Sequence, residues 1–540
     1  MIKKRIVIVL AVLAGVAGHL TAQTDDRGFE IAKNLEIFSN VYKQLNLNYV
    51  DDVDPGKTIK VAIDAMLASL DPYTNYYPES QMEDVKLQLL GQYGGIGSLI
   101  MQKGDSVYIS EPYKGLPADE AGIRAGDRIV AVDGQSTEGK TTQDVSSAMR
   151  GQAGTDVVLR LERDGKMFDV TVKRREIKLP NVPYYGYVGD NKDFGYIKLD
   201  EFTTDAAKHV RDAFVSLKNK NPKMKGVILD LRGNGGGLMN EAVDIVNIWV
   251  PRGVLVVETK GNVASKNIKS YTRFNPEDTE IPVAVLIDGG SASASEIVSG
   301  SLQDLDRAVI IGQRSYGKGL VQNILPMAYN SQMKVTVSKY YIPSGRCIQA
   351  IDYSHRDEQG RAIRVPDSLK TAFKTKGGRT VYDGFGIEPD VEVEPEYMSN
   401  IAVALVQKFL VFDYVTQYVR THKDLPPASE FEVSDELYAD FCRYLKDKNL
   451  SYSTVTERVI QELRDVAKEE KYADAIEQQI KDMEAALERE KEGDLQKHRE
   501  EICDMLRAEL LVRYYYDEGR VEGGLKHDKV VLRAIEELKK

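Results

Sequence analysis

The fold is decided by the stretch Gly226-Val-Ile-Leu-Asp-Leu-Arg-Gly-Asn-Gly-Gly-Gly237. Its first half, residues 226–231, is the apolar run expected of a strand that is buried on both faces. A glycine-rich turn follows, and residues 238–250 then predict an apolar helix. Glycines between a strand and a helix let backbone amides point at an anion near the helix N-terminus. The turn could therefore serve a phosphate or an oxyanion, or be a turn with no further role.

A second strand, predicted at 283–287, leads into Asp288-Gly-Gly-Ser-Ala-Ser-Ala-Ser-Glu296 and a further helix. Small residues at a strand-to-helix turn are what an exposed serine nucleophile needs, because they leave room and free amides beside it. The same residues also form a capping box, with Ser293 at the N-cap and Glu296 three residues later. Taken alone, this stretch leaves capping and catalysis equally open.

A serine nucleophile needs a base that takes its proton. The six histidines do not lie in a glycine-rich, strand-edge setting; they are His19, His209, His355, His422, His498 and His527. Lys318 does lie in such a setting. It belongs to Gly312-Gln-Arg-Ser-Tyr-Gly-Lys-Gly319, which follows a strand predicted at 308–311. A lysine in apolar surroundings loses the solvation of its charge, so its neutral amine becomes available as a base.

The stretch 312–319 is also close to a Walker A loop, which would bind ATP. Gly319 stands where the hydroxyl residue that binds Mg²⁺ should be. Residues 320–326 read as a strand that ends at proline, whereas a Walker A loop requires a helix. We therefore expect no bound nucleotide.

The composition excludes several other classes of protein. The chain has 540 residues, 42% hydrophobic and 29% charged, which fits a globular protein of several domains. A net charge of −11 without a dense basic block argues against nucleic-acid binding. The three cysteines lie far apart and argue against a disulfide framework or a cysteine zinc site.

The N-terminus predicts export. Three basic residues, Lys3 to Arg5, precede twelve apolar residues at 6–17 and a short polar stretch, which together form a secretory signal at 1–22. The apolar run is about half the length of a membrane span, so an uncleaved anchor is the less favoured alternative. We expect a periplasmic or otherwise extracytoplasmic protein, membrane-associated if the signal is retained.

The mature chain divides into four regions. Residues 23–90 have apolar residues at helical spacing, and residues 91–176 change to short β segments with glycine-rich turns. Residues 177–396 alternate strand and helix, and residues 397–540 form long acidic helices. The stripe Ile476, Ile480, Met483 and Leu487 in the last region predicts a coiled-coil dimer seam, a substrate clamp or a packed helical hairpin.

The second region resembles a PDZ domain. The resemblance rests on the run from Leu116 to Gly134, with its Ala-Gly-Ile, Gly-Asp-Arg-Ile and Val-Asp-Gly segments, and on Tyr93-Gly-Gly-Ile-Gly97. It implies that an incoming peptide adds a strand while backbone amides of Gly95, Ile96 and Gly97 bind its C-terminal carboxylate. The alternative is a small β domain that only braces its neighbours.

The chain as a whole resembles the carboxy-terminal processing (tail-specific) proteases of the S41 serine peptidase family, over roughly residues 30–395. The motifs that carry the resemblance are Gly94–Gly97, Asp230–Gly237, Ser291–Glu296, Tyr316–Gly319, Tyr340–Arg346 and Gly386–Asp390. The resemblance implies a multidomain α/β protein with a crotonase-like α/β peptidase core, a PDZ β domain with short helices, and helical N-terminal and C-terminal regions.

The same resemblance implies a role for individual residues. It makes Ser293 the nucleophile, Lys318 the base and Gln322 the residue that orients the lysine. It places the oxyanion hole at the backbone amides of Ala294 and of one residue in the glycine-rich turn 232–237, which we call the glycine run. For the second amide we choose Gly236. Asp306 and Gln313 depart from the family pattern, in which glycine and glutamate are common at these positions; neither belongs to the dyad.

The predicted function is an exported serine endopeptidase that cleaves proteins or peptides with exposed C-termini and needs no metal, nucleotide or other cofactor. It could form a homodimer through its N-terminal or C-terminal helices. One alternative is a non-catalytic PDZ scaffold on a protease-like fold. The other is a crotonase-like acyl-CoA enzyme, which export and a PDZ domain disfavour. Whether the PDZ domain gates the site or only captures substrate stays open.

Overall fold

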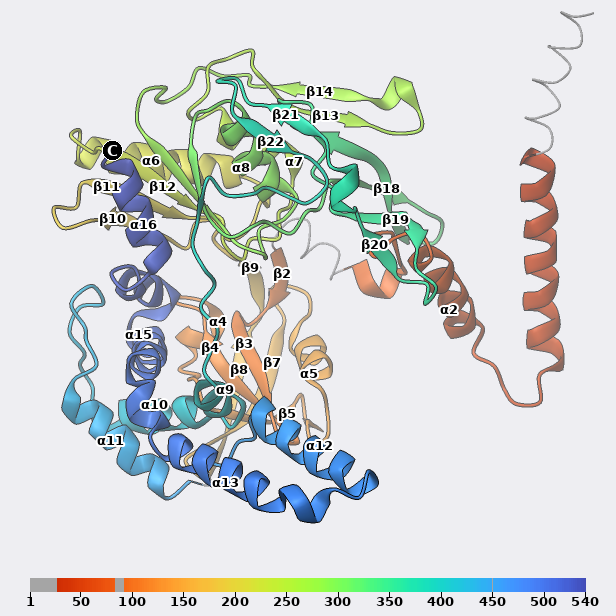
Figure 1. Cartoon of the computed structure of the whole chain (residues 1–540). Coiled ribbons are helices and arrows are strands. Elements are labelled where there is room, and N and C mark those ends of the chain that lie inside the picture. Colours follow the sequence, from red (N-terminus) through yellow and green to blue (C-terminus); the bar gives the residue numbers. More distant parts are fainter. Residues whose placement is uncertain (1–26, 83–91, 449) are drawn as a thin grey trace, which may run out of the picture. The chain divides into compact units, whose positions relative to one another are not determined.

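The computed structural model describes residues 27–82, 92–448 and 450–540 (Figure 1). The expected signal peptide at 1–22 lies outside these residues. Within the described ranges, no helix is both long and apolar enough to cross a membrane. The described residues form two compact units: those up to 79 together with 322–336, and those from 80 to 321 together with 337–540.

The first unit contains helices and a short piece of sheet. Residues 27–48 are helical, and α2 (Pro55–Ala68) follows, with the Asp54 carboxylate accepting the Lys57 N–H at its N-terminus. β1 (Asn75–Tyr77) then pairs antiparallel with the start of β18 (Gln332–Tyr341). The region that we expected to be helical therefore includes a strand, because its partner comes from a distant part of the chain and leaves no local signal.

A small β domain, residues 92–178, lies in the second unit. Its sheet has the strand order β3-β4-β5-β7-β8, with β6 beside β5. The strands are β3 (Ser98–Lys103), β4 (Ser106–Pro112), β5 (Arg128–Val132), β6 (Gln135–Ser136), β7 (Asp156–Arg163) and β8 (Lys166–Lys173). Alternate residues of β4 and β7 are buried, as expected when one face of a sheet covers a core. The helices α4 (Pro117–Glu120) and α5 (Thr142–Met149) complete the domain, and β2 (Gln92–Gly95) pairs with β9 (Arg175–Lys178) beside it.

The α/β core is a sheet of order β10-β11-β12-β15-β16-β23, parallel except for the β10–β11 pair. The strands are β10 (Tyr184–Val188), β11 (Phe194–Lys198), β12 (Gly226–Asp230), β15 (Val283–Ile287), β16 (Val309–Gly312) and β23 (Val391–Glu392). Every residue of β12 and β15 is buried, which explains why these strands are apolar apart from Asp230 at the end of β12.

Both faces of this sheet are covered. The helices α6 (Ala206–Lys220), α7 (Met239–Val246) and α8 (Ala294–Asp304) share a core with one face. The other face packs on α16 (Lys529–Leu538), the last helix of the chain (Figure 1). The last helix of the C-terminal region therefore completes the core of the α/β domain.

One predicted helix is shorter than expected. We predicted a helix over 238–250, but α7 ends at Val246. The buried side chain of Asn247 accepts the backbone N–H groups of Arg273 and Phe274 and donates to the Val250 carbonyl oxygen. These bonds compete with helix continuation, so the chain turns here.

Several short β elements flank the core. β13 (Leu255–Lys260) pairs with β14 (Ile268–Tyr271) and with the end of β18, and β17 (Leu320–Pro326) also pairs with β18. Two small hairpins follow, formed by β19 (Ile351–Arg356) with β20 (Ala362–Arg364), and by β21 (Ala372–Lys374) with β22 (Thr380–Tyr382).

The C-terminal helices form a core of their own before α16. They are α9 (Asn400–Gln407), α10 (Leu410–Thr421), α11 (Asp435–Lys446), α12 (Val455–Glu469), α13 (Ala473–Glu492), α14 (Asp494–Lys497) and α15 (Arg499–Gly524). α12 and α13 run antiparallel, joined by Arg464–Glu484 and Lys491–Glu457 ion pairs at 2.8 Å each. Ile480 of the predicted stripe is buried in this hairpin, whereas Met483 is 41% exposed. The dimer seam and the substrate clamp stay predictions.

Candidate active site

Ser293 occupies a strained turn between β15 and α8. Its backbone angles are φ 56° and ψ −111°, outside the regions that non-glycine residues ordinarily adopt. Such a conformation persists only where its surroundings impose it, and it is found most often at functional sites. Ser293 is also partly exposed, whereas Ser291 and Ser295 on either side are fully buried.

Glu296 holds this turn. Its Oε2 accepts the Ser293 backbone N–H at 2.8 Å and the Lys318 backbone N–H at 2.9 Å. Its Oε1 accepts the Ser315 hydroxyl at 2.5 Å and the Gly317 N–H at 2.7 Å. The side chain is fully buried, and burial raises the pKa of Glu296 to about 7, although its four donors oppose the rise. The carboxylate thus serves the capping box and also joins two loops that are separate in sequence.

Tyr340 joins the same two loops through their carbonyl groups. Its hydroxyl donates toward the carbonyl oxygens of Ser293 at 3.1 Å and of Lys318 at 2.6 Å. Tyr340 is 1% exposed, so its ring is fixed in the core. The predicted nucleophile and base are therefore brought together by two shared hydrogen-bonding groups.

The glycine run lies directly against the nucleophile turn. A Cβ atom on Gly236 would lie 2.6 Å from the Ala292 carbonyl oxygen and 2.8 Å from the Ala294 nitrogen, and Gly236 has φ +98°. Only glycine fits such a close approach. Ala294 is the first residue of α8, where backbone N–H groups have no partner within the helix.

The Gly236 amide itself is engaged. Its N–H donates to Asn234 Oδ1 at 2.8 Å, so it can serve an oxyanion only by exchanging that bond. The next amide, of Gly237, has no acceptor among the residues that the structure describes. The assignment of Gly236 to the oxyanion hole stays a prediction, with Gly237 as the neighbouring donor.

The two flanking serines have structural roles. The Ser291 hydroxyl donates to the Leu231 carbonyl oxygen at 2.8 Å, and the Ser295 hydroxyl donates to that of Asn234 at 2.9 Å. Both bonds tie the nucleophile turn to the glycine run.

Gln322 lies in the first unit, whereas Lys318 lies in the second. Its Nε2 donates to Thr336 Oγ1 at 3.2 Å. Its role in orienting Lys318 stays a prediction. Residues 320–326 form the strand β17, as predicted, and not the helix that a Walker A loop requires.

Asp306 and Gln313 are the two residues that depart from the family pattern, and the structure explains only the first. Asp306 has φ 50°, a conformation that favours glycine, and its carboxylate accepts from Arg379 at 2.7 Å and from the Gly377 N–H. The aspartate thus compensates the backbone cost with two bonds that glycine could not make. Gln313 lines a cavity at the edge of the sheet, and nothing in the structure explains the preference for glutamine there.

The role of Gly95, Ile96 and Gly97 in binding a carboxylate stays a prediction, and Gly95 is the last residue of β2, which pairs with β9. Gly97 has φ +72°, and a Cβ there would lie 2.6 Å from Leu116 Cβ. The loop enters β3, which is an edge strand of its sheet and so presents backbone groups for an added strand. Ile96 is 3% exposed and belongs to the core of the β domain.

An exposed Asp–Ser–His cluster is the strongest competing arrangement. Asp352 accepts from Ser354 Oγ at 2.5 Å and contacts His355 Nδ1 at 2.6 Å. All three residues lie in β19, and Ser354 Oγ lies 3.3 Å from His355 Nδ1, the same ring nitrogen that contacts the Asp352 carboxylate. In a catalytic triad the serine and the carboxylate use opposite nitrogens of the imidazole. This is the geometry of a polar turn and not of a nucleophile with its base.

Sequence reasoning missed Tyr340 as part of this site. Its signal was the motif Tyr340–Arg346, which carries the family resemblance. A single sequence does not show which of its two tyrosines points into the core.

Three family models match parts of the chain. The model described as peptidase family S41 matches residues 193–355, and a PDZ domain model matches residues 108–163. A model described as the C-terminal helical domain of a probable PDZ-protease matches residues 401–538.

Curated relatives agree with these matches, and a solved structure is also similar to the chain. The carboxy-terminal-processing protease of Bartonella bacilliformis is 36% identical over 357 residues, which are 65% of this chain and 81% of that protein. A probable CtpA-like serine protease of Staphylococcus aureus (strain COL) is 32% identical over 382 residues, 70% of this chain and 69% of that protein. Among solved structures, a photosystem II D1 C-terminal processing protease is 26% identical with a TM-score of 0.36, and the match covers 66% of this chain and 87% of that chain.

Proposed function

Because the chain belongs to the carboxy-terminal-processing proteases of peptidase family S41 and carries a PDZ domain, we propose that it is an exported serine endopeptidase with a Ser293–Lys318 dyad. Its substrates are proteins with exposed C-terminal tails. The observation that carries the proposal is the pair of supports shared by the two residues, the Glu296 carboxylate and the Tyr340 hydroxyl.

The chemistry follows from these two residues. The neutral amine of Lys318 takes the proton of the Ser293 hydroxyl as Oγ attacks the carbonyl carbon of the scissile bond. The protonated amine then gives that proton to the leaving nitrogen, which departs as the new N-terminus. Water, activated by the same lysine, attacks the acyl-enzyme and releases the new C-terminus.

The negative charge on the substrate oxygen needs donors that are already in place. The Ala294 N–H at the start of α8 is one, and the helix dipole adds to its effect. The glycine run supplies the second, from Gly236 after it releases Asn234 or from Gly237. These assignments are supported by the close approach of Gly236 to Ala294.

The substrate tail is bound by the PDZ domain. The edge strand β3 accepts the tail as an added strand, and the amides of Gly95, Ile96 and Gly97 bind its carboxylate. The positive φ of Gly97 supports this, since it turns the backbone of the loop.

Export and self-association complete the proposal. The basic and apolar residues at 1–22 act as a secretory signal, so the mature protein begins near Gln23. The helix at 27–48 exposes apolar side chains that a second copy could cover, namely Phe29, Ile31, Leu35, Phe38 and Val41. N-terminal sequencing of the mature protein and its molar mass in solution test these two points.

The central experiment compares wild type with Ser293→Ala on an unfolded protein substrate. Wild type should cleave it, with or without a chelator and without ATP, and the variant should not. A wild type that binds tails without cleaving them would instead support the non-catalytic PDZ scaffold. Activity that is lost in EDTA and restored by a divalent metal would contradict the metal-free mechanism.

A further inference from the structure

The last helix of the chain lies on the strands that carry the catalytic turns. Val531, Ala534 and Ile535 of α16 are buried against β12, β15 and β16. β12 leads into the glycine run, β15 into Ser293 and β16 into the Lys318 loop. α16 is therefore placed where it can act on the geometry of the site.

A polar contact joins α16 to the beginning of the glycine run. Arg232 donates to both carboxylate oxygens of Asp528, with Nη1 at 3.0 Å and Nη2 at 2.7 Å. Asp528 is the N-cap of α16 and also accepts the N–H groups of Val530 at 2.9 Å and Val531 at 3.1 Å. One carboxylate thus caps the helix and binds the arginine.

Arg232 is held on its other side by the sheet. Its Nε and Nη2 donate to Asp230 at 3.0 and 2.6 Å, and its carbonyl oxygen accepts from Lys198 Nζ at 2.6 Å. Asp230 is fully buried and also accepts the Tyr196 hydroxyl at 2.6 Å. The sheet side of the arginine is therefore rigid, and Asp528 supplies the support from the helical region.

A short chain of bonds leads from Arg232 to the nucleophile turn. The next residue, Gly233, donates its N–H to Asp288 Oδ1 at 2.9 Å. The same oxygen accepts the N–H groups of Gly290 at 2.9 Å and Ser291 at 3.1 Å. A shift of Arg232 would therefore move the glycine run relative to the turn that holds Ser293.

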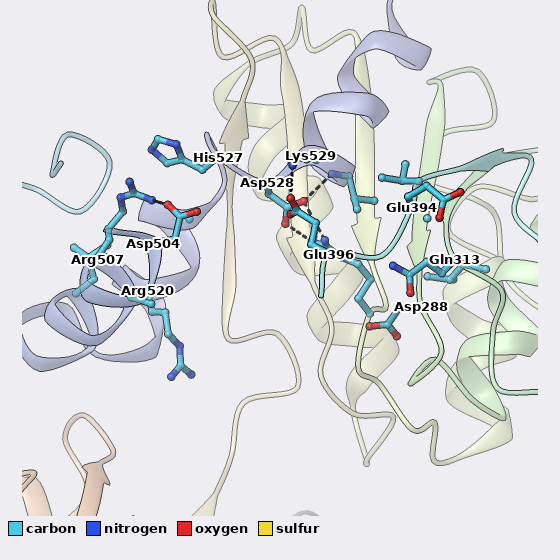
Figure 2. A pocket seen from close by; sticks show the side chains of 18 residues that line it. Asp288, Gln313, Glu394, Glu396, Asp504, Arg507, Arg520, His527, Asp528 and Lys529 are labelled. Carbon is cyan, nitrogen blue, oxygen red and sulfur yellow. Dashed lines mark hydrogen bonds and ion pairs between the residues drawn. The ribbon is translucent and has the colours of Figure 1, made fainter. Parts of the chain in front are cut away.

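Among the contacts that the structure describes, Asp528 is the carboxylate that Arg232 binds on the side away from Asp230. Arg232, Asp528 and Asp288 line a cavity of about 440 Å³ between the sheet edge and the C-terminal helices (Figure 2). The neighbouring lysine, Lys529, contacts Glu396 on the cavity wall instead. Loss of the Asp528 charge would leave the outer side of Arg232 facing this cavity.

We propose that Asp528 is a positioning residue of the catalytic site, which fixes the oxyanion-binding glycine run through Arg232. The inference rests on the proposed function, since it concerns the rate of the same reaction. It makes the C-terminal helix a part of the catalytic apparatus and not only of the folded core.

The test is Asp528→Asn in the full chain. Asparagine caps helices as well as aspartate does, so α16 should stay in place while Arg232 loses one of its two carboxylate partners and keeps Asp230. We expect kcat to fall about tenfold with KM nearly unchanged, as for the weakening of one charge-assisted hydrogen bond that matters in the transition state. A peptide boronate, which forms a tetrahedral adduct with the nucleophile, should bind more weakly by a similar factor.

Lys529→Gln is the matched control, because it removes the adjacent charge of the same helix and should leave kcat unchanged. Binding of an intact substrate should be equal in Ser293→Ala and in Ser293→Ala/Asp528→Asn. Adding Asp528→Asn to Arg232→Gln should cause no further loss of kcat, because both act through one contact. Active-site titration and thermal unfolding separate a slower site from a smaller folded fraction.

Wild-type kcat in Asp528→Asn, or an equal loss in Lys529→Gln, would overturn the inference. So would a further loss in the double variant, since Asp528 would then act by a route other than Arg232. If Asp528→Asn does not fold, Asp528→Ser keeps an uncharged cap and takes its place. The absence of Ser293-dependent cleavage in wild type would contradict the proposed function instead, and is read from the same assays.

Discussion

The backbone N–H groups of Ser293 and Lys318 donate to the same oxygen atom, Oε2 of Glu296, at 2.8 and 2.9 Å. The shared acceptor fixes the distance between the two loops and holds Ser293 at its unusual φ of 56°. The carboxylate must be ionised to accept all four of its donors, since a protonated oxygen would turn an O–H toward an N–H. The protonation state of Glu296 should therefore control the shape of the site.

The first prediction concerns pH. Burial raises the pKa of Glu296 from its ordinary value of 4.5 to about 7 in the folded protein. Between these values the folded state binds the proton more tightly than the unfolded chain. The stability contributed by the neutral form is therefore complete below 4.5 and is lost as the pH rises through about 7, in total roughly 3 kcal/mol.

Activity should change in the opposite direction over the same range, because the ionised form has the productive geometry. Urea unfolding and initial rates on both sides of pH 7 check this. In Glu296→Gln the stability should lose this dependence on pH, and kcat should be low throughout because an amide cannot accept four donors. Rates in wild type that fall as the pH rises through 7 would contradict the assignment.

The second prediction separates the three serines. Ser293→Ala and Lys318→Ala should each abolish cleavage, and the double variant should be no worse, because the pair acts as a unit. Ser291→Ala and Ser295→Ala should keep substantial activity and lose about 1 kcal/mol of stability each, the usual worth of a buried hydrogen bond. A dead Ser295→Ala beside an active Ser293→Ala would move the nucleophile to Ser295.

The third prediction is for Tyr340→Phe. The change keeps the buried ring but leaves the carbonyl oxygens of Ser293 and Lys318 without their shared donor, at a cost of about 1–3 kcal/mol in stability. We expect kcat to fall more than KM rises, since the loss affects the alignment of the dyad. Tyr341→Phe is the control, because that neighbouring ring contacts Lys260 instead. Equal kinetics in the two variants would show that the Tyr340 hydroxyl has no role in catalysis.

Local sequence patterns predicted the strands around the site well. β15 and β17 have the bounds that we expected, because strands buried on both faces or set between glycine turns have strong local signals. The capping role of Glu296 was also visible, since the box spans only four residues.

Contacts made by distant segments could not be predicted in the same way. The second loop that Glu296 holds, the strand β1 and the place of α16 on the peptidase sheet all depend on such contacts. The helical spacing of the apolar residues in α16 predicts that one face of the helix is buried. It does not predict which part of the protein covers that face. The contact between Asp528 and Arg232 was therefore invisible in the sequence.

The last prediction concerns the capture of tails. Amidating the C-terminus of a protein substrate removes the charge that the Gly95–Gly97 amides would bind, and should lower kcat/KM through KM by one or two charge-assisted hydrogen bonds at most, about 1–3 kcal/mol each. Gly97→Ala should abolish the difference between free and amidated tails, because a Cβ there collides with Leu116 and disfavours the φ of +72°. Gly104→Ala is a matched control: its φ is +59°, but a Cβ would meet nothing within 4 Å.

The same variant separates capture of substrate from gating of the site. A rise in KM alone in Gly97→Ala means that the PDZ domain only captures substrate, whereas faster cleavage of short peptides means that it also gates the site. Equal cleavage of free and amidated tails by wild type would exclude both roles.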